Sequence, residues 1–112
     1  HQSKEENQMK VALFGAGDIG LYQLPGEHPE RELAEMLGGE TEMARIDRRL
    51  KLVTRRDGET ERLTIRYALH RLGHEPEPIA GECAVVAVGP EGCLLDMGRH
   101  DLAVAVRHIR PV

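Results

Sequence analysis

The strongest constraint on the fold is the dipeptide Asp57-Gly58, which separates two segments of alternating apolar and polar residues, 50–56 and 59–66. Asp-Gly between such segments favours a two-residue type I′ turn. A turn of this type sets the register of the strands on either side, and it places Leu52 opposite Leu63. We therefore expect a β-hairpin with one apolar face and one polar face.

The polar face of this predicted hairpin is strongly basic. Residues 45–71 contain nine Lys and Arg against four Asp and Glu, a local net charge of +5 in a chain whose net charge is −4. Such a concentration of charge predicts a surface for an anionic partner. The alternative is that these cations pair inside the fold with the acidic helix predicted at 29–37 and with Glu75, Glu77 and Glu82. The candidate binding residues are Arg49, Lys51, Arg55, Arg62 and Arg66.

A helix is predicted over residues 29–37, which begin with a proline suited to the first helical turn. Leu33, Met36 and Leu37 recur at helical spacing, and Gly38-Gly39 supplies a stop. A helix this short is marginal by itself. We therefore expect its apolar stripe to pack on a sheet.

The rest of the chain is divided by glycine and proline into short segments of strand composition. Segments 10–14 and 21–24 flank one glycine-rich turn, and segments 83–88 and 93–97 flank another. Residues 102–106 are predicted as the last strand, although their composition also allows a short helix.

The predicted fold class is α+β, a mostly antiparallel sheet built from hairpins with one short helix packed on it. Residues 9–112 are expected to form a single domain, with a helical turn at 67–72. Residues 1–8 are wholly polar, and we expect them to be the remnant of an expression tag or a disordered tail.

The two cysteines, Cys83 and Cys93, lie in the two strands of the second hairpin. If Val88 faces Cys93, the cysteines are about 16 Å apart and on opposite faces, which excludes a disulfide within the hairpin. We therefore expect both thiols to be reduced, as in the cytoplasm. The sequence also shows no secretory leader and no apolar run of about 20 residues, so we expect a cytoplasmic protein without a membrane span.

The pattern Gly15-x-Gly17-x-x-Gly20 copies the dinucleotide-binding fingerprint. That fingerprint needs a helix to open at its last glycine, and Pro25 follows too closely for one. We interpret the pattern as a glycine-rich turn and predict no cofactor.

His70 and His74 have the spacing that would place two imidazoles on one helix face, where they could hold a metal ion. Gly73 lies between them, and three further glycines or prolines follow before residue 82. We therefore interpret them as loop histidines and predict no metal site. No pattern nominates a catalytic residue.

Four short motifs occur in a distinctive order: the segment Leu-Pro-Gly-Glu-His-Pro at 24–29, the helix stop at 37–39, the segments around Asp57-Gly58 and the segment Ile-Ala-Gly at 79–81. In this order the chain resembles a family of small uncharacterised proteins encoded on conjugative elements and phages of gut Firmicutes. The resemblance covers residues 20–97. The family has no agreed activity, so the resemblance implies a genomic setting rather than a mechanism.

These observations predict a non-enzymatic interaction module of a mobile genetic element. Its basic hairpin face would bind an anionic or protein partner, in a role such as modulation of host defence or of transfer. Nucleic-acid binding by the same face is the alternative, and an enzyme of unknown class is the third hypothesis. The sequence contains only three aromatic residues, which disfavours stacking on single-stranded nucleic acid.

Overall fold

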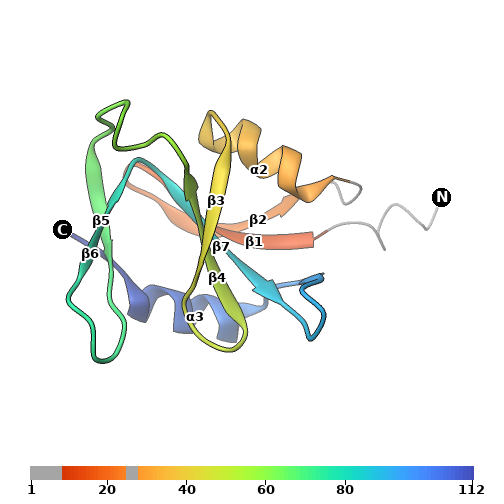
Figure 1. Cartoon of the computed structure of the whole chain (residues 1–112). Coiled ribbons are helices and arrows are strands. Elements are labelled where there is room, and N and C mark those ends of the chain that lie inside the picture. Colours follow the sequence, from red (N-terminus) through yellow and green to blue (C-terminus); the bar gives the residue numbers. More distant parts are fainter. Residues whose placement is uncertain (1–8, 25–27) are drawn as a thin grey trace.

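The computed structural model describes residues 9–24 and 28–112 of the chain. The expectation for residues 1–8 lies outside the described residues. The described residues form nine strands and two helices, and the predicted α+β class is confirmed (Figure 1). The elements are β1 (Met9–Phe14), β2 (Ile19–Leu24), α2 (Pro29–Leu37), β3 (Thr41–Arg45), β4 (Leu50–Arg55), β5 (Ile65–Leu69), β6 (Glu77–Ala80), β7 (Cys83–Val88), β8 (Leu94–Leu95), α3 (Arg99–His108) and β9 (Ile109–Pro111).

The strands form two antiparallel sheets. The larger sheet has the order β2-β1-β7-β4-β3, and β8 adds to it by pairing with β7. The smaller sheet has the order β6-β5-β9. In Figure 1, α2 lies on one side of the larger sheet and α3 on the other, with the smaller sheet at one end.

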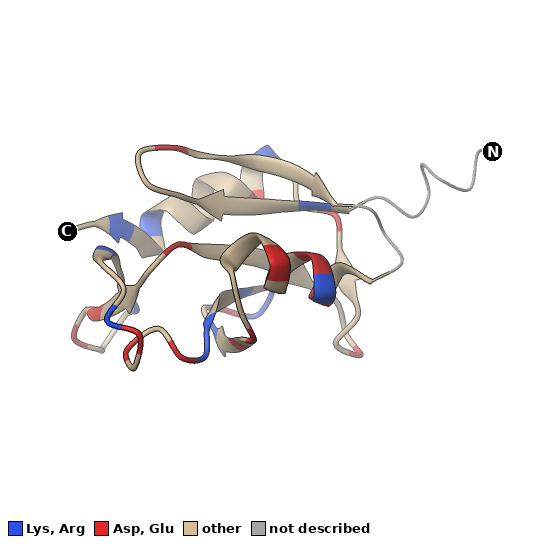
Figure 2. Cartoon of the chain, turned by 90° about the horizontal axis from the view of Figure 1, so that it is seen from above, with Lys and Arg blue, Asp and Glu red and all other residues tan. Residues whose placement is uncertain are grey.

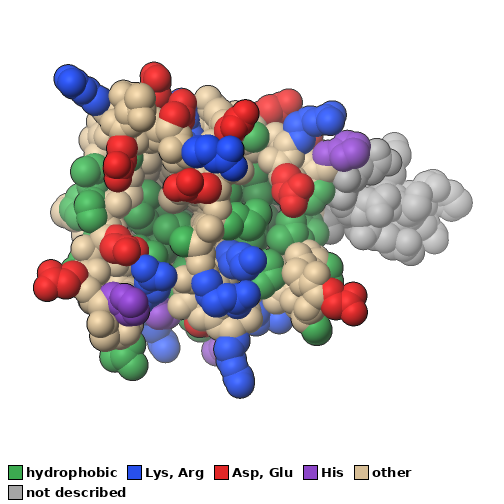
Figure 3. Space-filling view, in the orientation of Figure 1, with side chains coloured by type: hydrophobic (Ala, Val, Ile, Leu, Met, Phe, Trp, Pro, Cys, Tyr) green, Lys and Arg blue, Asp and Glu red, His purple; other side chains and the backbone are tan. Residues whose placement is uncertain are grey.

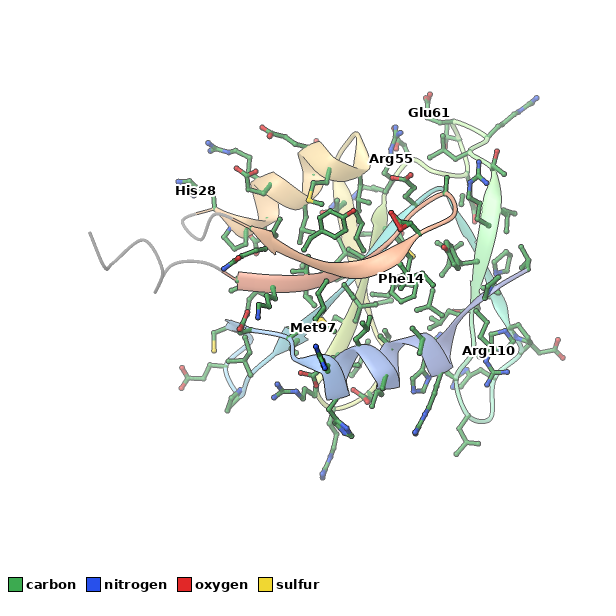
Figure 4. All side chains as sticks on the ribbon, turned by 180° about the vertical axis from the view of Figure 1, so that it is seen from behind. Phe14, His28, Arg55, Glu61, Met97 and Arg110 are labelled. Atoms are coloured by element: carbon green, nitrogen blue, oxygen red, sulfur yellow. The ribbon has the colours of Figure 1, made fainter. Side chains whose placement is uncertain are left out.

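The larger sheet is covered on both faces, so its central strand is apolar throughout. All six residues of β7 are buried. One core lies between the sheet and α2, where Leu33 and Leu37 contact Val53 and its neighbours. The second core lies between the sheet, α3 and the smaller sheet, and includes Phe14 and Met97 (Figure 4). A strand with two buried faces is typical of the centre of a sheet.

The predicted helix and the predicted first hairpin are confirmed. Helix α2 spans Pro29–Leu37 and ends where Gly38 adopts a left-handed conformation with φ +90°. In the hairpin, β1 pairs with β2 from Met9 opposite Leu24 to Phe14 opposite Ile19. Gly15 and Gly17 of the three-glycine pattern lie in the turn between these strands, as we expected, whereas Gly20 belongs to β2 and pairs with Leu13.

The predicted hairpin around Asp57-Gly58 is wrong. Strand β4 pairs with β3 and β7 in the larger sheet, whereas β5 pairs with β6 and β9 in the smaller one. Residues 56–62 form a wide turn instead of a two-residue turn. Both faces of β4 are buried, through Leu52 on one and Val53 on the other, so β4 is stabilised by two neighbours of its own.

Two other local predictions are corrected. Residues 102–106 lie in α3 rather than in a last strand, so the helical alternative holds. The Asp101 carboxylate begins that helix by accepting the Gly98 N–H at 3.1 Å. Residues 65–69, which overlap the helical turn expected at 67–72, form β5. There, antiparallel pairing of β5 with both β6 and β9 outweighs the local preference of these residues for a helical turn.

The second predicted hairpin is present with a small change of register. Val88 pairs with Leu94 rather than Cys93, because the Gly89 N–H donates to the Cys93 carbonyl at 2.7 Å and closes a longer loop. Both cysteines are free, with Cys83 buried and Cys93 exposed. Within the described chain, no helix combines the length and apolar character needed to cross a membrane.

Candidate functional site

The structure does not gather the five predicted binding residues on one face. Arg49 lies in the turn between β3 and β4, and Lys51 and Arg55 lie on β4 itself. Arg62 is in the turn after β4, and Arg66 is on β5 in the other sheet. The one-face argument is therefore wrong, because it assumed that β4 and β5 pair.

Arg49 is neutralised inside the fold. Its Nε donates to Asp101 Oδ1 at 2.8 Å, and its Nη2 donates to Asp101 Oδ2 at 3.1 Å. These hydrogen bonds raise the pKa of Arg49 and hold the pKa of the Asp101 carboxyl below its ordinary value. A two-point pair of this kind favours one geometry, so Arg49 attaches the β3–β4 turn to α3.

Arg55 is also engaged internally, at the opposite end of β4. Its guanidinium donates to the two carboxylate oxygens of Asp57 at 3.0 and 3.1 Å, which lowers the pKa of that carboxyl. The same side chain lies against the end of α2, where a Cβ atom at Gly39 would be 3.1 Å from the Arg55 Nε. Only 18% of the side chain is exposed. Arg55 is thus a packing residue between β4 and α2.

The expectation of internal neutralisation therefore holds for Arg49 and Arg55, although their partners are Asp101 and Asp57. For Lys51, Arg62 and Arg66 the structure gives no ion pair within residues 9–24 and 28–112. These three side chains do not form a single surface.

A different basic cluster forms at the β3–β4 turn, and we call it the basic turn: Arg45, Arg48, Arg49 and Lys51. Arg45 and Lys51 are cross-strand partners at the start of the turn. Figure 3 shows Lys and Arg side chains gathered over the lower end of β3 and β4. Sequence reasoning included Arg49 and Lys51 but assigned them to another hairpin.

The backbone of the basic turn is held by its own polar groups. Asp47 accepts the N–H groups of Arg49 and Leu50 at 2.9 and 2.8 Å. The Arg45 guanidinium donates to the carbonyls of Asp47 and Arg48 at 3.0 and 3.3 Å. The Asp47 carboxylate is therefore engaged by backbone donors, and its negative charge also helps to raise the pKa of Arg49.

Acidic residues gather at the other end of the molecule. Glu30, Glu32 and Glu35 lie on α2, and Asp57, Glu59 and Glu61 lie in the turn after β4, as Figure 2 shows on the ribbon. The chain thus has a basic β3–β4 turn at one end and an acidic helix α2 at the other, whereas the 56–62 turn carries both signs, with Arg56 and Arg62 beside its three acidic residues (Figure 1). Such separation orients charged partners during encounter.

A pocket of about 540 Å³ lies between β3–β4 and β6, and we call it the β3–β6 pocket. Leu52, Leu69 and Ile79 line it, and all three are buried in the second core. Glu42, Glu59 and Glu77 are exposed lining residues that place carboxylates around the opening. Figure 3 shows hydrophobic side chains in this hollow between β3 and the smaller sheet.

The histidines and cysteines that were weighed as metal ligands or nucleophiles do not form a common site among the described residues. β5 ends at Leu69, so His70 and His74 do not share a helix face. His108 contacts the His70 carbonyl through Nδ1 at 2.8 Å. Within the described residues no set of three or more His, Cys, Asp or Glu is arranged to hold a metal. Burial raises the pKa of Cys83 to about 12, so its thiol stays protonated.

No protein-family model, no curated protein and no solved structure matches the chain. The fold and the surface define an α+β domain with two antiparallel sheets and a basic β3–β4 turn.

Proposed function

We propose that the protein is a non-enzymatic interaction module whose basic turn binds an acidic surface of a protein partner. The observation that carries the proposal is the state of Arg48 and Lys51. Neither makes an ion pair with a described residue, and both lie beside the paired Arg49. Like charges at such short separation repel one another and raise the free energy of the unbound surface. An anionic partner relieves this cost.

The local geometry supports recognition rather than chemistry. The Asp47 hydrogen bonds and the Arg49–Asp101 pair hold the turn in one conformation. A preorganised basic surface loses little entropy on binding. The buried Cys83 thiol, by contrast, is poorly suited to act as a nucleophile because the thiolate is the reactive form.

The resemblance drawn from the sequence adds a setting to this proposal. A module encoded on a mobile element would meet host proteins or proteins of the element itself. A cytoplasmic location belongs to the same proposal and is supported by the two unbonded cysteines.

The proposal is tested with two labelled probes of matched charge, an acidic peptide of eight residues with six glutamates and a short single-stranded DNA. Binding is measured by fluorescence anisotropy at low and moderate salt. We expect the peptide to bind, and the double variant Arg48→Gln/Lys51→Gln to weaken it by about two- to tenfold, since each exposed pair contributes up to about 1 kcal/mol. Arg49 is left unchanged because it is structural.

The matched control is Arg62→Gln/Arg66→Gln, which removes the same charge away from the basic turn. This variant should bind the peptide like the unchanged protein. Equal loss in both double variants, or no peptide binding at low salt, would overturn the proposal. DNA binding that is tighter than peptide binding and falls steeply with salt would favour the nucleic-acid alternative instead.

A further inference from the structure

A second surface lies along β3, which is an open edge of the larger sheet. The Arg56 N–H donates to the Glu40 carbonyl at 2.8 Å just before β3. The Ile46 N–H donates to the Leu50 carbonyl at 2.9 Å just after it. The N–H and C=O groups of even-numbered residues therefore face β4. Those of the odd-numbered residues between them face away from the sheet.

Three residues of β3 thus present backbone groups at the open edge: Thr41, Met43 and Arg45. The Thr41 and Arg45 carbonyls each accept one hydrogen bond, from the side chains of Arg56 and Arg71. For the Met43 N–H and C=O, no hydrogen bond to another described residue is present in the structure. The Met43 side chain is 38% exposed. The middle of this edge is therefore available for another strand.

The β3–β6 pocket lies beside the same edge. The side chains of Glu42 and Ala44 line the pocket, and so do those of their β4 partners Thr54 and Leu52. A strand added to β3 would run about 4.8 Å from it, with alternate side chains on the face of Glu42 and Ala44. Those side chains would enter the pocket.

The charge at the pocket selects the side chain that fits. Glu42 and Glu59 are exposed, and no ion pair joins either of them to another described residue. The cations that line the pocket, Arg55 and Arg56, are paired with acidic residues outside its lining. The pocket thus combines an apolar floor with uncompensated negative charge at its opening.

We propose that β3 and the β3–β6 pocket bind an extended segment of a partner protein that pairs with β3 and inserts one lysine or arginine side chain. The methylene stem of that side chain would cover Leu52, Leu69 and Ile79. Its cationic head would stay at the opening beside Glu42 and Glu59. Main-chain pairing supplies affinity in this mode, and the pocket supplies specificity. The basic turn has the opposite charge, so this site is independent of the function proposed above.

The probe is a set of seven-residue peptides, acetylated and amidated, of sequence Thr-Val-Thr-Xaa-Thr-Val-Thr. Xaa is lysine, arginine, norleucine or glutamate. Binding is followed by NMR shifts of the Met43 and Ala44 amides and of the Leu52 and Ile79 methyl groups. We expect all four groups to shift with lysine or arginine, and affinity to fall about two- to fivefold with norleucine and further with glutamate.

Two pairs of variants separate the pocket charge from the strand edge. Glu42→Gln should weaken the lysine peptide by about two- to fivefold, while Glu35→Gln on α2 should leave it unchanged. Met43→Pro removes the outward N–H without touching the bonds to β4, so it should abolish binding. Met43→Val keeps that N–H and should bind. A thermal melt of each variant shows whether it is folded. Two lysine peptides test the edge without any substitution, one N-methylated at Xaa and each alternate residue and the other N-methylated at the residues between them. Only one of these two sets of N–H groups faces β3, the first in a parallel and the second in an antiparallel pairing, so one of the two peptides should lose binding.

Binding of the glutamate and lysine peptides with equal affinity would overturn the charge argument. Shifts confined to residues outside β3 and the pocket, unchanged binding by both N-methylated peptides, or no shifts at millimolar peptide would overturn the site. Failure of these peptides leaves the acidic-peptide result at the basic turn unaffected, so the two proposals are distinguishable.

Discussion

Asp101 in the first turn of α3 and Arg49 in the β3–β4 turn form a two-point ion pair that joins the last helix to the larger sheet. The Asp101 side chain is only 11% exposed, whereas the Arg49 side chain is about half exposed. Asp101 also accepts the Gly98 N–H at the start of the helix. One carboxylate therefore begins α3 and positions the base of the proposed binding surface.

Replacement of Asp101 should destabilise the protein at neutral pH. Asp101→Ala removes a helix cap and leaves Arg49 without its partner, and we expect a loss of about 0.5 to 2 kcal/mol in the free energy of unfolding. Urea denaturation at pH 7 measures it. His100→Ala, which alters the neighbouring exposed residue of the same helix, is the control and should have a smaller effect. Equal stability of the Asp101 variant and the unchanged protein would contradict the structural role of the pair.

The same pair makes stability depend on pH in a defined direction. The pKa of Asp101 is lower in the folded state than in the unfolded chain, chiefly because Arg49 donates hydrogen bonds to the carboxylate. Its contribution is therefore complete above the unfolded pKa, which is about 3.9, and is lost as the pH falls through the folded value. We expect the stability difference between the unchanged protein and Asp101→Asn to shrink as the pH falls from 5 towards 2. A difference that does not change over this range would contradict the assignment.

The two sheets are joined by a hydrogen bond from the Tyr67 hydroxyl to the Gly15 carbonyl, 2.7 Å long. The Tyr67 ring also packs edge-on against Phe14, with ring centroids 5.6 Å apart. Tyr67→Phe keeps the ring and removes the donor, so we expect a loss of about 1 to 2 kcal/mol by denaturant unfolding. Tyr22→Phe changes an exposed tyrosine and should be nearly neutral. Equal effects of the two variants would show that the hydrogen bond does not join the sheets.

Gly81 has to be glycine for two reasons, its backbone and its neighbour. Its φ is +86°, and a Cβ atom there would lie 2.7 Å from Leu63 Cδ1. Gly73 has a similar φ of +79° with no atom within 4 Å of a Cβ. We therefore expect Gly81→Ala to cost about 1 to 3 kcal/mol, and Gly73→Ala to cost less, since it carries only the backbone strain. Thermal melts of both variants make the comparison, and a larger loss at Gly73 would contradict it.

Features determined by neighbouring residues were predictable. Pro29 and Gly38 bound α2, and the glycines after Phe14 turn β1 into β2, because caps and turns depend on a few local atoms. The hairpin around Asp57-Gly58 was not predictable in the same way. A turn preference of this kind is weak beside the pairing of β4 with the wholly buried β7, which lies about 30 residues further along the chain.

The candidate sites likewise combine features that depend on neighbouring residues, which were predictable, with features that depend on the sheet order, which were not. Arg45, Asp47, Arg48 and Arg49 lie within five residues, so the composition of the basic turn was visible, but its isolation from Arg62 and Arg66 depends on the sheet order. The β3–β6 pocket joins residues from two sheets that contact only in the folded chain. Residues 103–106 alternate Ala and Val after Leu102, which suits a strand and a helix equally, so only packing against the second core assigns them to α3.

The two thiols should differ in reactivity because Cys93 is exposed and Cys83 is buried. The folded protein should titrate one thiol rapidly with a disulfide reagent at pH 8, and the denatured, unreduced protein should titrate two. Since burial raises the pKa of Cys83 to about 12, the fraction of thiolate at pH 8 is negligible, and its reaction must wait for unfolding. The slow phase should therefore accelerate in denaturant, while the fast phase should vanish in Cys93→Ser. Two fast thiols in the folded protein would show that β7 is not the buried centre of the sheet. Fewer than two thiols in the denatured protein would show a disulfide, which the strand pairing excludes.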